Sequence, residues 1–428
     1  MSRYYIWTIG CQMNKADSER LAASLEQRGY QPAVKTADAD LVVINSCVVR
    51  QSAENRVVGR LDTIKKLKRD RPNVIIALTG CLVDTQNEEL RRRFPQVDFF
   101  FKPQAFDDLL QFVGLGKESH EGLPLSSEAQ VCVYVPVIQG CNNFCSYCIV
   151  PYRRGREKSR PEAEVSSEVE RLAAQGVREV TLLGQNVDAY GHDLPERADL
   201  ADLLRELNAV PCLERIRFLT SHPKDMTPKL VEAVASLDKV CEHISLPLQA
   251  GDDEILQAMR RGYNMRQYCD LVAQIRSAIA GVALSTDVIV GFPGETEEQF
   301  QKTVGVLREL RFDTVHVAAY SPRPGTASAG MKESVSSSQK KRRLAEVEAL
   351  QEGVATEINS ALQGSVVEVL VEGQRDSKWF GRTRTNKLVF FKDAADCRGQ
   401  MVRILVEKTS PWYLRGSLTR LGGGGSRR

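Results

Sequence analysis

The sequence has no hydrophobic run long enough to cross a membrane, because no stretch approaches the roughly 20 apolar residues that span a bilayer. The short apolar run from Ile6 to Cys11 also lacks the basic segment that opens an export signal. We therefore expect a cytoplasmic protein without membrane contact. The eleven cysteines are odd in number and lie in a long chain without an export signal, which argues against a disulfide framework and favours metal binding.

The sequence also lacks a strong charge of either sign, since its 58 Lys and Arg face 55 Asp and Glu and give a net charge of +3. So small a net charge indicates nothing about partners. Residues 364–428 differ, because thirteen Lys and Arg there outnumber six Asp and Glu, and this local excess predicts contact with a polyanion. A length of 428 residues exceeds what one hydrophobic core usually supports, so two or three domains are expected.

One group of cysteines, Cys141, Cys145 and Cys148, lacks a fourth ligand nearby, since no Cys or His follows within forty residues. Thiolates suit zinc or iron–sulfur clusters, and a structural zinc ion normally completes its tetrahedron with a close fourth ligand. The incomplete set therefore favours an iron–sulfur cluster with one open iron. A zinc site completed by a distant residue, or three buried cysteines that only pack, stay open as alternatives.

The first hundred residues predict a parallel, doubly wound sheet. Apolar runs at Tyr4–Ile9, Leu41–Ile44 and Val74–Leu78 alternate with helical patterns at Asp17–Arg28 and from Ser52 to about Lys68. A cysteine follows each apolar run: Cys11, Cys47 and Cys81. The loops at the carboxyl ends of parallel strands line one crevice. We therefore expect these thiols to converge on a second cluster site with an open position, although any one of them alone is more simply a small residue at a strand end.

Residues 113–130 predict a linker, and six apolar runs alternating with helical patterns after it predict a partial or complete parallel barrel. The runs are Val131–Val137, Val180–Leu183, Ile216–Leu219, Ile244–Leu248, Val282–Val290 and Val315–Ala319. In barrels the working site lies on the loops that follow the strands. Here those loops carry glycines, amides and hydroxyls, which predict a pocket for a polar, nucleoside-sized cofactor above the Cys141 loop.

Residues 336–362 predict a long charged helix, and the short alternating runs after Gly364 predict a small β-barrel. Basic and aromatic residues alternate in these runs: Arg382, Arg384, Lys387 and Arg403 with Phe380, Phe390 and Phe391. Such alternation is typical of a strand with a buried aromatic face and a solvated basic face. It also occurs in barrels that bind RNA through phosphate contacts and base stacking. Residues 422–428 predict a flexible basic tail.

The motifs resemble a known family. Cys141, Cys145 and Cys148, with the aromatic Tyr147, resemble the signature of radical S-adenosylmethionine (SAM) enzymes, and Val150–Arg160 resembles their methylthiotransferase branch. The resemblance covers nearly the whole chain, including Gly10–Asn14, Leu183–Val187 and Gly381–Asn386, the last in a segment similar to TRAM domains. Within the branch, Gln12–Asn14 and Arg382–Asn386 are most similar to enzymes that act on isopentenyladenosine in tRNA, rather than on threonylcarbamoyladenosine or a ribosomal protein.

The resemblance implies an α/β protein of three domains. These are an N-terminal doubly wound methylthiotransferase domain at 1–115, a radical SAM core with a partial (β/α)6 barrel at 128–360, and a TRAM-like RNA-binding β-barrel at 361–424. It implies that Cys141, Cys145 and Cys148 hold a 4Fe-4S cluster whose free iron binds SAM, and that Cys11, Cys47 and Cys81 hold an auxiliary 4Fe-4S cluster. We expect six residues to position SAM: Tyr147, Gly184, Gln185, Asn186, Gln249 and Asp287. The Gly184–Asn186 segment departs from the Gly-Gly-Glu of many radical SAM enzymes but matches the branch.

The implied reaction adds a methylthio group to C2 of N6-isopentenyladenosine beside the anticodon and uses two SAM per product. Because C2 is unactivated, the implied mechanism removes its hydrogen with a 5′-deoxyadenosyl radical and joins the carbon to sulfur from the auxiliary cluster. The implied partners of a monomeric chain are the tRNA anticodon stem-loop and a reducing electron donor protein. Two other hypotheses stay open, namely a methylthiotransferase for a different adenosine or a protein side chain, and a zinc-dependent RNA-binding protein without catalysis.

The other cysteines and two of the histidines are expected to be structural: Cys132, Cys212, Cys241, Cys269, Cys397, His222 and His243.

Overall fold

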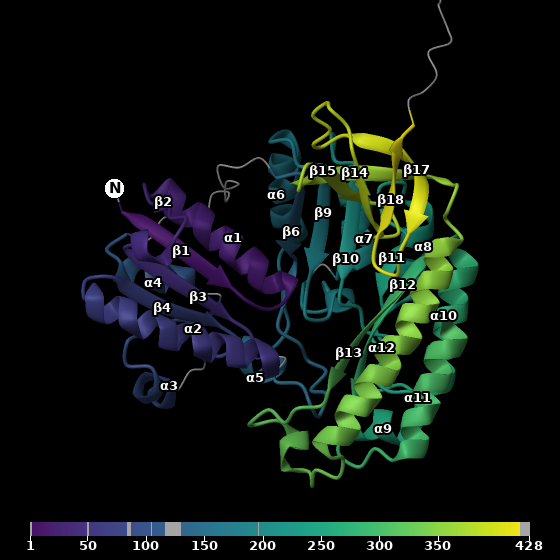
Figure 1. The fold of residues 1–428 in the computed structure, drawn as a ribbon, viewed down its shortest axis with the longest axis horizontal. Coiled ribbons are helices and arrows are strands. Elements are labelled where there is room, and N and C mark those ends of the chain that lie inside the picture. The colour runs from purple at the N-terminus through teal and green to yellow at the C-terminus, as the bar shows by residue number, and fades with distance from the viewer. Residues whose placement is uncertain are drawn as a thin grey trace, which may run out of the picture.

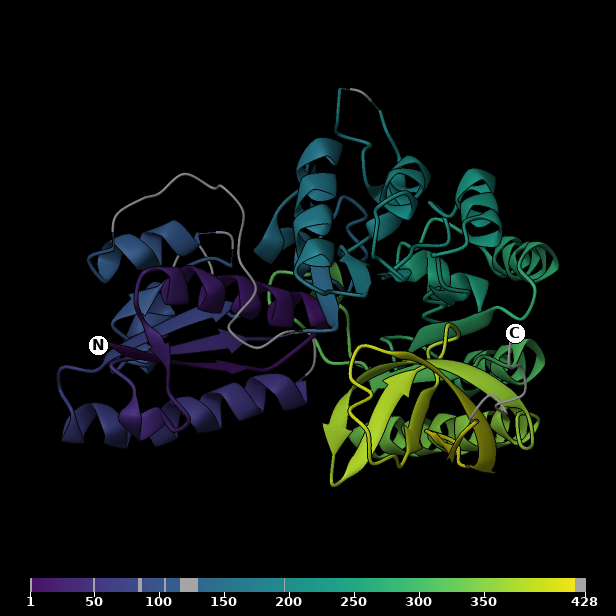
Figure 2. The same ribbon diagram turned by 90° about the horizontal axis from the view of Figure 1, so that it is seen from above.

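The computed structural model describes residues 2–48, 51–83, 87–103, 105–115, 130–195 and 197–419. Three folded parts follow one another: an N-terminal sheet covered by helices, a central row of parallel strands, and a C-terminal β-barrel (Figures 1 and 2). Most of the predicted linker at 113–130 and the whole predicted tail at 422–428 lie outside the described residues. Among the helices described, none is long and apolar enough to span a bilayer.

The N-terminal sheet has five parallel strands in the order β2-β1-β3-β4-β5. They are β1 (Arg3–Thr8), β2 (Gln31–Pro32), β3 (Leu41–Ser46), β4 (Ile75–Gly80) and β5 (Phe99–Phe100). The strand order reverses between β1 and β3, which is where doubly wound sheets open a crevice at the carboxyl ends of their strands. The predicted doubly wound sheet is confirmed, and the structure adds the short edge strands β2 and β5.

Helices cover both faces of this sheet (Figure 2). They are α1 (Gln12–Gln27), α2 (Gln51–Asp70), α3 (Glu88–Arg93) and α4 (Phe106–Phe112). Leu61 of α2 belongs to the hydrophobic cluster on one face, whereas Leu25 of α1 belongs to the cluster on the other. The prediction that the first helix begins at Asp17 is wrong, since α1 begins directly after Cys11. Asn14 and Asp17 are buried polar residues, and they interrupt the apolar pattern of the first turns.

The central part is a curved row of six parallel strands. They are β6 (Cys132–Pro136), β9 (Glu179–Leu183), β10 (Arg215–Leu219), β11 (His243–Ser245), β12 (Ala283–Val290) and β13 (Thr314–Ala319). A parallel bridge between Ile216 and Val240 joins the sheet β10-β9-β6 to the sheet β11-β12-β13. The predicted partial (β/α)6 barrel is confirmed.

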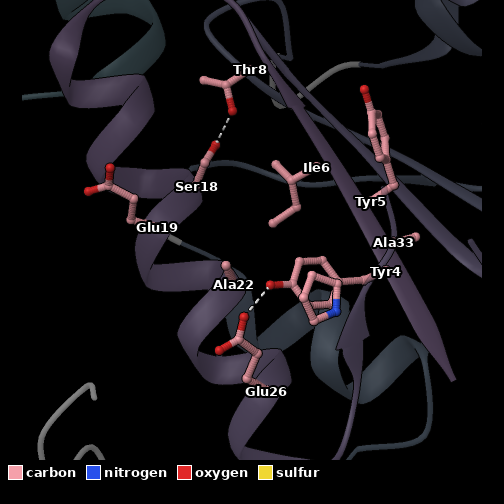
Figure 3. A pocket seen from close by; sticks show the side chains of 10 residues that line it. Tyr4, Tyr5, Ile6, Thr8, Ser18, Glu19, Ala22, Glu26 and Ala33 are labelled. Atoms are coloured by element: carbon pink, nitrogen blue, oxygen red, sulfur yellow. Dashed lines mark hydrogen bonds between the residues drawn. The ribbon is translucent and has the colours of Figure 1, made fainter. Parts of the chain in front are cut away.

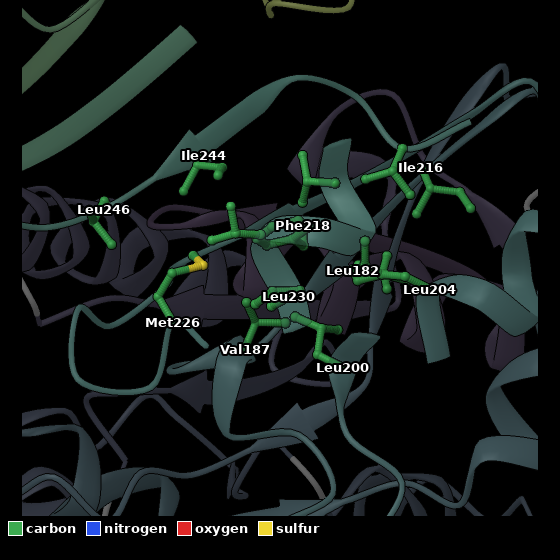
Figure 4. Close-up of a cluster of buried hydrophobic side chains, with 14 of the residues drawn as sticks. Leu182, Val187, Leu200, Leu204, Ile216, Phe218, Met226, Leu230, Ile244 and Leu246 are labelled. Atoms are coloured by element: carbon green, nitrogen blue, oxygen red, sulfur yellow. The ribbon is translucent and has the colours of Figure 1, made fainter. Parts of the chain in front are cut away.

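Helices pack on the outside of these strands: α6 (Glu162–Ala174), α7 (Leu200–Asn208), α8 (Pro228–Ser236), α9 (Asp253–Ala258), α10 (Met265–Ala278), α11 (Glu297–Leu310) and α12 (Ser337–Ser360). Figure 4 shows the core between them, where Leu204 of α7 and Leu230 of α8 pack with Leu182 and Phe218 of the strands. This packing leaves the loops at the carboxyl ends of the strands to form a site.

The C-terminal part is a closed barrel in the order β14-β15-β16-β18-β17. Its strands are β14 (Val366–Arg375), β15 (Lys378–Arg382), β16 (Leu388–Phe391), β17 (Met401–Thr409) and β18 (Leu414–Leu418). Val371, Trp379 and Phe391 pack in its core. The predicted small β-barrel is therefore confirmed.

A loop of this barrel docks on the amino ends of the central strands, away from α5 (Val150–Arg154) and α9 (Figure 1). Arg217 of β10 donates to the carbonyl oxygens of Thr383 and Arg384, each at 2.7 Å. The Arg384 side chain then donates to both carboxylate oxygens of Glu242, at 2.7 and 2.8 Å. The loop is thus held through its backbone and through an ion pair.

The expectation that Arg384 and Lys387 belong to a solvated basic face is wrong. Lys387 pairs with Asp313 at 2.8 Å, and both side chains are less than one-fifth exposed. Arg384 pairs with Glu242, which directly precedes β11. Both cations attach the barrel to the core because acidic residues stand at the amino ends of β11 and β13. They are consequently not free to contact RNA phosphates.

Replacing Arg217 by methionine is expected to destabilise the protein by about 3–5 kcal/mol, the usual cost of leaving a buried charge unpaired. Arg217 lies 2.9 Å from Glu179, and the two side chains are 4% and 6% exposed. The double replacement Arg217→Met with Glu179→Leu removes both charges and should recover part of that loss, whereas the carbonyl oxygens of Thr383 and Arg384 lose their donor in both variants. Urea unfolding of the two variants tests this, and equal destabilisation of both would contradict it.

Candidate functional site

The Cys141 loop lies between β7 (Ile138–Gln139) and α5 (Val150–Arg154), at the carboxyl end of the central strands. Cys141 and Cys145 are each 8% exposed, and Cys148 is partly buried. The Cys148 amide donates to the Cys145 carbonyl oxygen at 3.0 Å, which folds the loop back on itself. Burial raises the pKa of Cys141 and raises that of Cys148 to about 12. The thiolates therefore need a cationic group beside them, which a metal cluster supplies.

A glycine shapes the entry to this loop. Gly140 has a φ of +79°, which favours glycine, and a Cβ at this position would lie 2.0 Å from the Arg156 carbonyl oxygen. The Gly140 amide donates to Oε1 of Gln185 at 2.5 Å. Gln185, which was expected to bind SAM, therefore uses this oxygen to fix the cysteine loop.

Replacing Gly140 by alanine is expected to cost roughly 2–6 kcal/mol of stability, since a strained backbone and overpacking each cost roughly 1–3 kcal/mol. Gly155→Ala is the matched control, because Gly155 has a φ of +83° but no atom within 4 Å of an added Cβ. Urea unfolding of the two variants measures the difference. If both lose the same stability, the close contact with Arg156 has no energetic role.

Polar contacts from the end of α9 hold the other side of the loop. The Ser146 amide donates to the Met259 carbonyl oxygen at 3.0 Å, and its hydroxyl donates to the Ala258 carbonyl oxygen at 2.7 Å. Two segments far apart in sequence therefore fix the loop between Cys145 and Cys148. This leaves the cysteines little freedom to rearrange when they bind a group.

Arg261 is a site residue that the sequence did not reveal. It is 5% exposed, and its Nη1 lies 3.4 Å from Sγ of Cys145 and 3.5 Å from the hydroxyl of Tyr147. Its positive charge therefore stands directly beside a cysteine of the loop. Tyr147, a predicted SAM residue within the cysteine loop, packs against a cluster that includes Phe292 and Tyr320. A single arginine without regular spacing gave no sequence signal.

The remaining predicted SAM residues lie at or near the carboxyl ends of strands. Gly184 follows β9, and a Cβ on it would lie 2.5 Å from the Ile138 side chain, so this turn packs against the strand that leads to the cysteines. Nδ2 of Asn186 donates to Asp225 at 2.7 Å, whereas its buried Oδ1 has no hydrogen-bond partner among the described residues. That oxygen is an acceptor available to a ligand.

Gln249 and Asp287 lie together on the other half of the barrel. The Gln249 amide donates to the Asp287 carbonyl oxygen at 2.8 Å, and Gln249 has a φ of +71°. Asp287 lies on β12 and is partly exposed between two buried neighbours. The structure therefore brings these two residues together and places them across the barrel from Gly184.

The second group of thiols follows three neighbouring strands of the N-terminal sheet, since Cys11, Cys47 and Cys81 come after β1, β3 and β4. Cys47 and Cys81 are each 4% exposed, whereas Cys11 is exposed. A Cβ on Gly10 would lie 2.6 Å from Cβ and 3.2 Å from Sγ of Cys47. The loops after β1 and β3 thus touch, and glycine permits the contact. The structure brings the three thiols to one end of the sheet.

The described ranges contain no group of three His, Cys, Asp or Glu side chains close enough to bind a single metal ion. In an iron–sulfur cluster each thiolate binds a different iron. The burial of Cys47, Cys81, Cys141 and Cys145 and the adjacent cations Arg261 and Arg154 suit such an anionic cluster.

Sequence families match three consecutive parts of the chain. They are the uncharacterized protein family UPF0004 at residues 3–102, the radical SAM superfamily at residues 135–307 and the TRAM domain at residues 361–419. The tRNA-2-methylthio-N(6)-dimethylallyladenosine synthase of Dehalococcoides mccartyi is 51% identical over 422 residues, which cover 98% of this chain and 99% of that protein. Proteins of the same name from Roseiflexus sp. and Dictyoglomus thermophilum are 49% and 45% identical, and the matches cover 98% of this chain and 90% and 99% of theirs.

The chain belongs to the tRNA-2-methylthio-N(6)-dimethylallyladenosine synthase family. The predicted family is thus confirmed, and the radical SAM match confirms SAM and 4Fe-4S clusters as the cofactors. Among solved structures, the radical SAM methyltransferase TsrM from Kitasatospora setae matches with a TM-score of 0.57 at 16% identity, covering 77% of this chain and 75% of that one. The radical SAM enzyme OxsB matches with a TM-score of 0.52 at 10% identity, covering 82% and 56%. These two likenesses show the fold.

In this family member the two groups of thiols lie beside each other. Ile149, which directly follows Cys148, packs in one hydrophobic cluster with Val48 and Cys81. Arg154 ends α5, the short helix that follows Ile149. Its side chain is buried against α1 of the N-terminal domain. The carboxyl ends of the two sheets therefore face a shared region.

A shallow pocket between β1 and α1 is separate from this region (Figure 3). Its lining includes Tyr4, whose hydroxyl donates to Glu26 at 2.6 Å, and Thr8, whose hydroxyl donates to Ser18 at 2.7 Å. None of the predicted site residues lines it. The pocket is consequently not part of the candidate site.

Proposed function

We propose that this enzyme transfers a methylthio group to C2 of N6-isopentenyladenosine beside the anticodon of tRNA and consumes two SAM per product. The observation that carries the proposal is the hydrophobic cluster of Ile149, Val48 and Cys81, because it joins the residue after Cys148 to a cysteine of the other group. A reaction that must both remove hydrogen from an unactivated carbon and deliver sulfur to it needs two such centres at close range.

We assign the ligands as follows. Cys141, Cys145 and Cys148 hold the cluster that binds SAM, and Cys11, Cys47 and Cys81 hold the auxiliary cluster. When bound, the first cluster supplies the electron that cleaves SAM and the second carries the sulfur. The electron comes from a reducing donor protein in the cytoplasm, where the enzyme acts as a monomer.

The chain's own residues position SAM and the thiolates. Arg261 donates to Sγ of Cys145 and holds that side chain in place. Gln185 holds the Cys141 loop through the Gly140 amide, and the free Oδ1 of Asn186 is available to a donor on SAM. Gln249 and Asp287 meet the ligand from the opposite half of the barrel. Two walls of one pocket thus hold the cofactor near the cysteine loop.

The outer surface of the C-terminal barrel carries a row of aromatic side chains that suits RNA. Phe380 of β15 pairs across the strands with Phe390 of β16, and their ring centroids are 6.3 Å apart. Tyr413 lies edge-on to Phe390 at 5.7 Å, and the exposed Arg415 lies 4.9 Å from the Tyr413 ring. Partly exposed rings beside an arginine are suited to stacking on bases and pairing with phosphates. We propose that this row binds tRNA, while Arg384 and Lys387 hold the barrel in place.

Replacing Phe390 by alanine is expected to weaken tRNA binding by roughly 1–3 kcal/mol, the usual contribution of one stacked base. Val366→Ala is the matched control, because Val366 is a 43% exposed apolar residue of the same barrel on β14, outside the row. Filter binding of labelled tRNA at fixed salt measures both affinities. Equal affinity of the Phe390 variant and the control would exclude the row from the RNA interface.

Mass spectrometry of the reaction products, nucleosides for tRNA and peptides for protein, tests the proposed function. The reconstituted enzyme is incubated anaerobically with SAM, a reductant, a sulfur source and one of three substrates: tRNA containing isopentenyladenosine, tRNA containing threonylcarbamoyladenosine, or ribosomal protein. We expect a methylthio product only from the first. A product only from the second or third would replace the proposed substrate, and zinc in place of iron and sulfide would refute the proposed chemistry.

Iron counting tests the ligand assignment independently of the substrate. The triple variant Cys11→Ala, Cys47→Ala, Cys81→Ala is expected to hold half of the iron of the parent after anaerobic reconstitution. Equal iron content in the two proteins would refute the auxiliary site.

A further inference from the structure

Arg154 is the side chain of the radical SAM core that enters the auxiliary site. It ends α5, the helix that follows Cys148, and its side chain is only 2% exposed. Its Nη2 donates to Oδ2 of Asp17 at 2.9 Å and to Oδ1 of Asn14 at 3.3 Å, both on α1 of the N-terminal domain. A charge from one domain is thus buried in the other.

The partners of Arg154 frame the cysteine loops. Asn14 is fully buried, its Nδ2 donates to the Ser46 carbonyl oxygen at 2.8 Å, and its Oδ1 accepts from Sγ of Cys11 at 3.3 Å. Asn14 therefore connects the thiol after β1 to the backbone just before the thiol after β3. Because Arg154 donates to the same Oδ1, it is tied to both loops.

The guanidinium of Arg154 stands among the thiols. Its Nη1 is buried and has no hydrogen-bond partner at normal distance among the described residues. The guanidinium interacts electrostatically with Cys11, Cys81 and Asp17, and it lies within reach of a side-chain hydrogen bond to Cys81. Leaving a buried donor unpaired is costly, and an arginine that only joined two domains would not need to stand among thiols. The arrangement indicates an acceptor that arrives with the bound group.

We propose that Arg154 is a positioning residue of the auxiliary site, fixed by Asp17, which supplies a positive charge and the Nη1 donor to a sulfur of the group bound by Cys11, Cys47 and Cys81. This proposal rests on the ligand assignment above. Hydrogen bonds to sulfur and net charge both set the reduction potential of an iron–sulfur cluster. Arg154 therefore raises the potential of the auxiliary cluster, and Asp17 moderates that effect.

The test measures the midpoint potential of the auxiliary cluster alone, by electron paramagnetic resonance during a redox titration. All variants are made in the Cys141→Ala, Cys145→Ala, Cys148→Ala background, so that only the auxiliary cluster gives a signal. Arg154→Gln is expected to make reduction about tenfold less favourable, which is about 59 mV for a one-electron couple. Arg154→Lys, which keeps the charge, should shift the potential less. Asp17→Asn should shift it in the opposite direction.

The opposite signs of the potential shifts in the Arg154 and Asp17 variants distinguish an electrostatic role from a structural one. Arg323→Gln is the matched control, because Arg323 is another buried arginine that joins the two domains, through Glu54 at 2.9 Å. This replacement is expected to leave the potential unchanged. Loss of iron in Arg154→Gln that Arg154→Lys restores would also support the proposal. Three results would overturn the proposal. They are unchanged potentials, shifts of the same sign in the Arg154 and Asp17 variants, and loss of iron in both Arg154→Gln and Arg154→Lys. A background protein that binds no iron would instead refute the ligand assignment.

Discussion

Replacing Cys145 by alanine is expected to abolish the reductive cleavage of SAM. Cys145 is 8% exposed, accepts a hydrogen bond from Arg261, and is one of three thiols in a loop fixed at both ends. Two thiolates without the third cannot hold a cluster and present one open iron in a defined direction. The 5′-deoxyadenosine formed under dithionite, measured by liquid chromatography, should fall to the level seen without enzyme.

Cys269→Ala provides the control for this prediction. Cys269 lies in the same domain on α10 and is partly buried, but it belongs to neither group of thiols. Its replacement should leave both iron content and SAM cleavage at the level of the parent. If the Cys145 variant still cleaves SAM at the rate of the parent, the cluster that cleaves SAM is held elsewhere.

The cysteine groups could be predicted from sequence because their spacing follows backbone geometry. Cys141, Cys145 and Cys148 lie within one loop, and Cys11, Cys47 and Cys81 each follow an apolar run by two or three residues. Parallel strands put such residues at one end of a sheet. Local sequence and sheet direction are therefore enough to group the thiols, without any knowledge of how the domains pack.

The residues around the thiols could not be predicted, because their role depends on contacts between distant segments. Arg261 reaches Cys145 across more than a hundred residues of sequence, and Arg154 reaches Asp17 across the domain boundary. Each is a single charged residue that local sequence assigns to the surface. Only the tertiary fold shows that these residues are buried and paired.

The same limit explains the wrong expectation for the C-terminal barrel. The mixture of basic and aromatic residues indicates a partly exposed basic segment, but it does not show that Arg384 and Lys387 lie in the loop between β15 and β16 or what packs against that loop. There the amino ends of the central strands present Glu242 and Asp313. A basic side chain on the surface of a domain is available to RNA only if no other domain packs against it.

Replacing Cys47 by alanine is expected to eliminate the methylthio product while SAM cleavage continues. The change removes only Sγ and keeps the Cβ that lies beside Gly10, so the fold should not change. With tRNA deuterated at C2 of the target adenosine, deuterium should still appear in 5′-deoxyadenosine, because the substrate and the radical SAM core are untouched. Mass spectrometry of nucleoside and 5′-deoxyadenosine measures both results in one reaction.

Deuterium transfer distinguishes two roles for the Cys47 group, by which we mean Cys11, Cys47 and Cys81. If deuterium transfer persists without methylthio product, the Cys47 group acts after hydrogen removal and delivers sulfur. If deuterium transfer disappears while SAM is still cleaved, the group instead positions the adenosine, and the sulfur role is refuted. Persistence of the product would show that Cys47 is not needed as a ligand. Ile149 and Cys81 belong to one hydrophobic cluster, so a change in one site can disturb the other. SAM cleavage at the parental rate without methylthio product is therefore the result that establishes two separate sites.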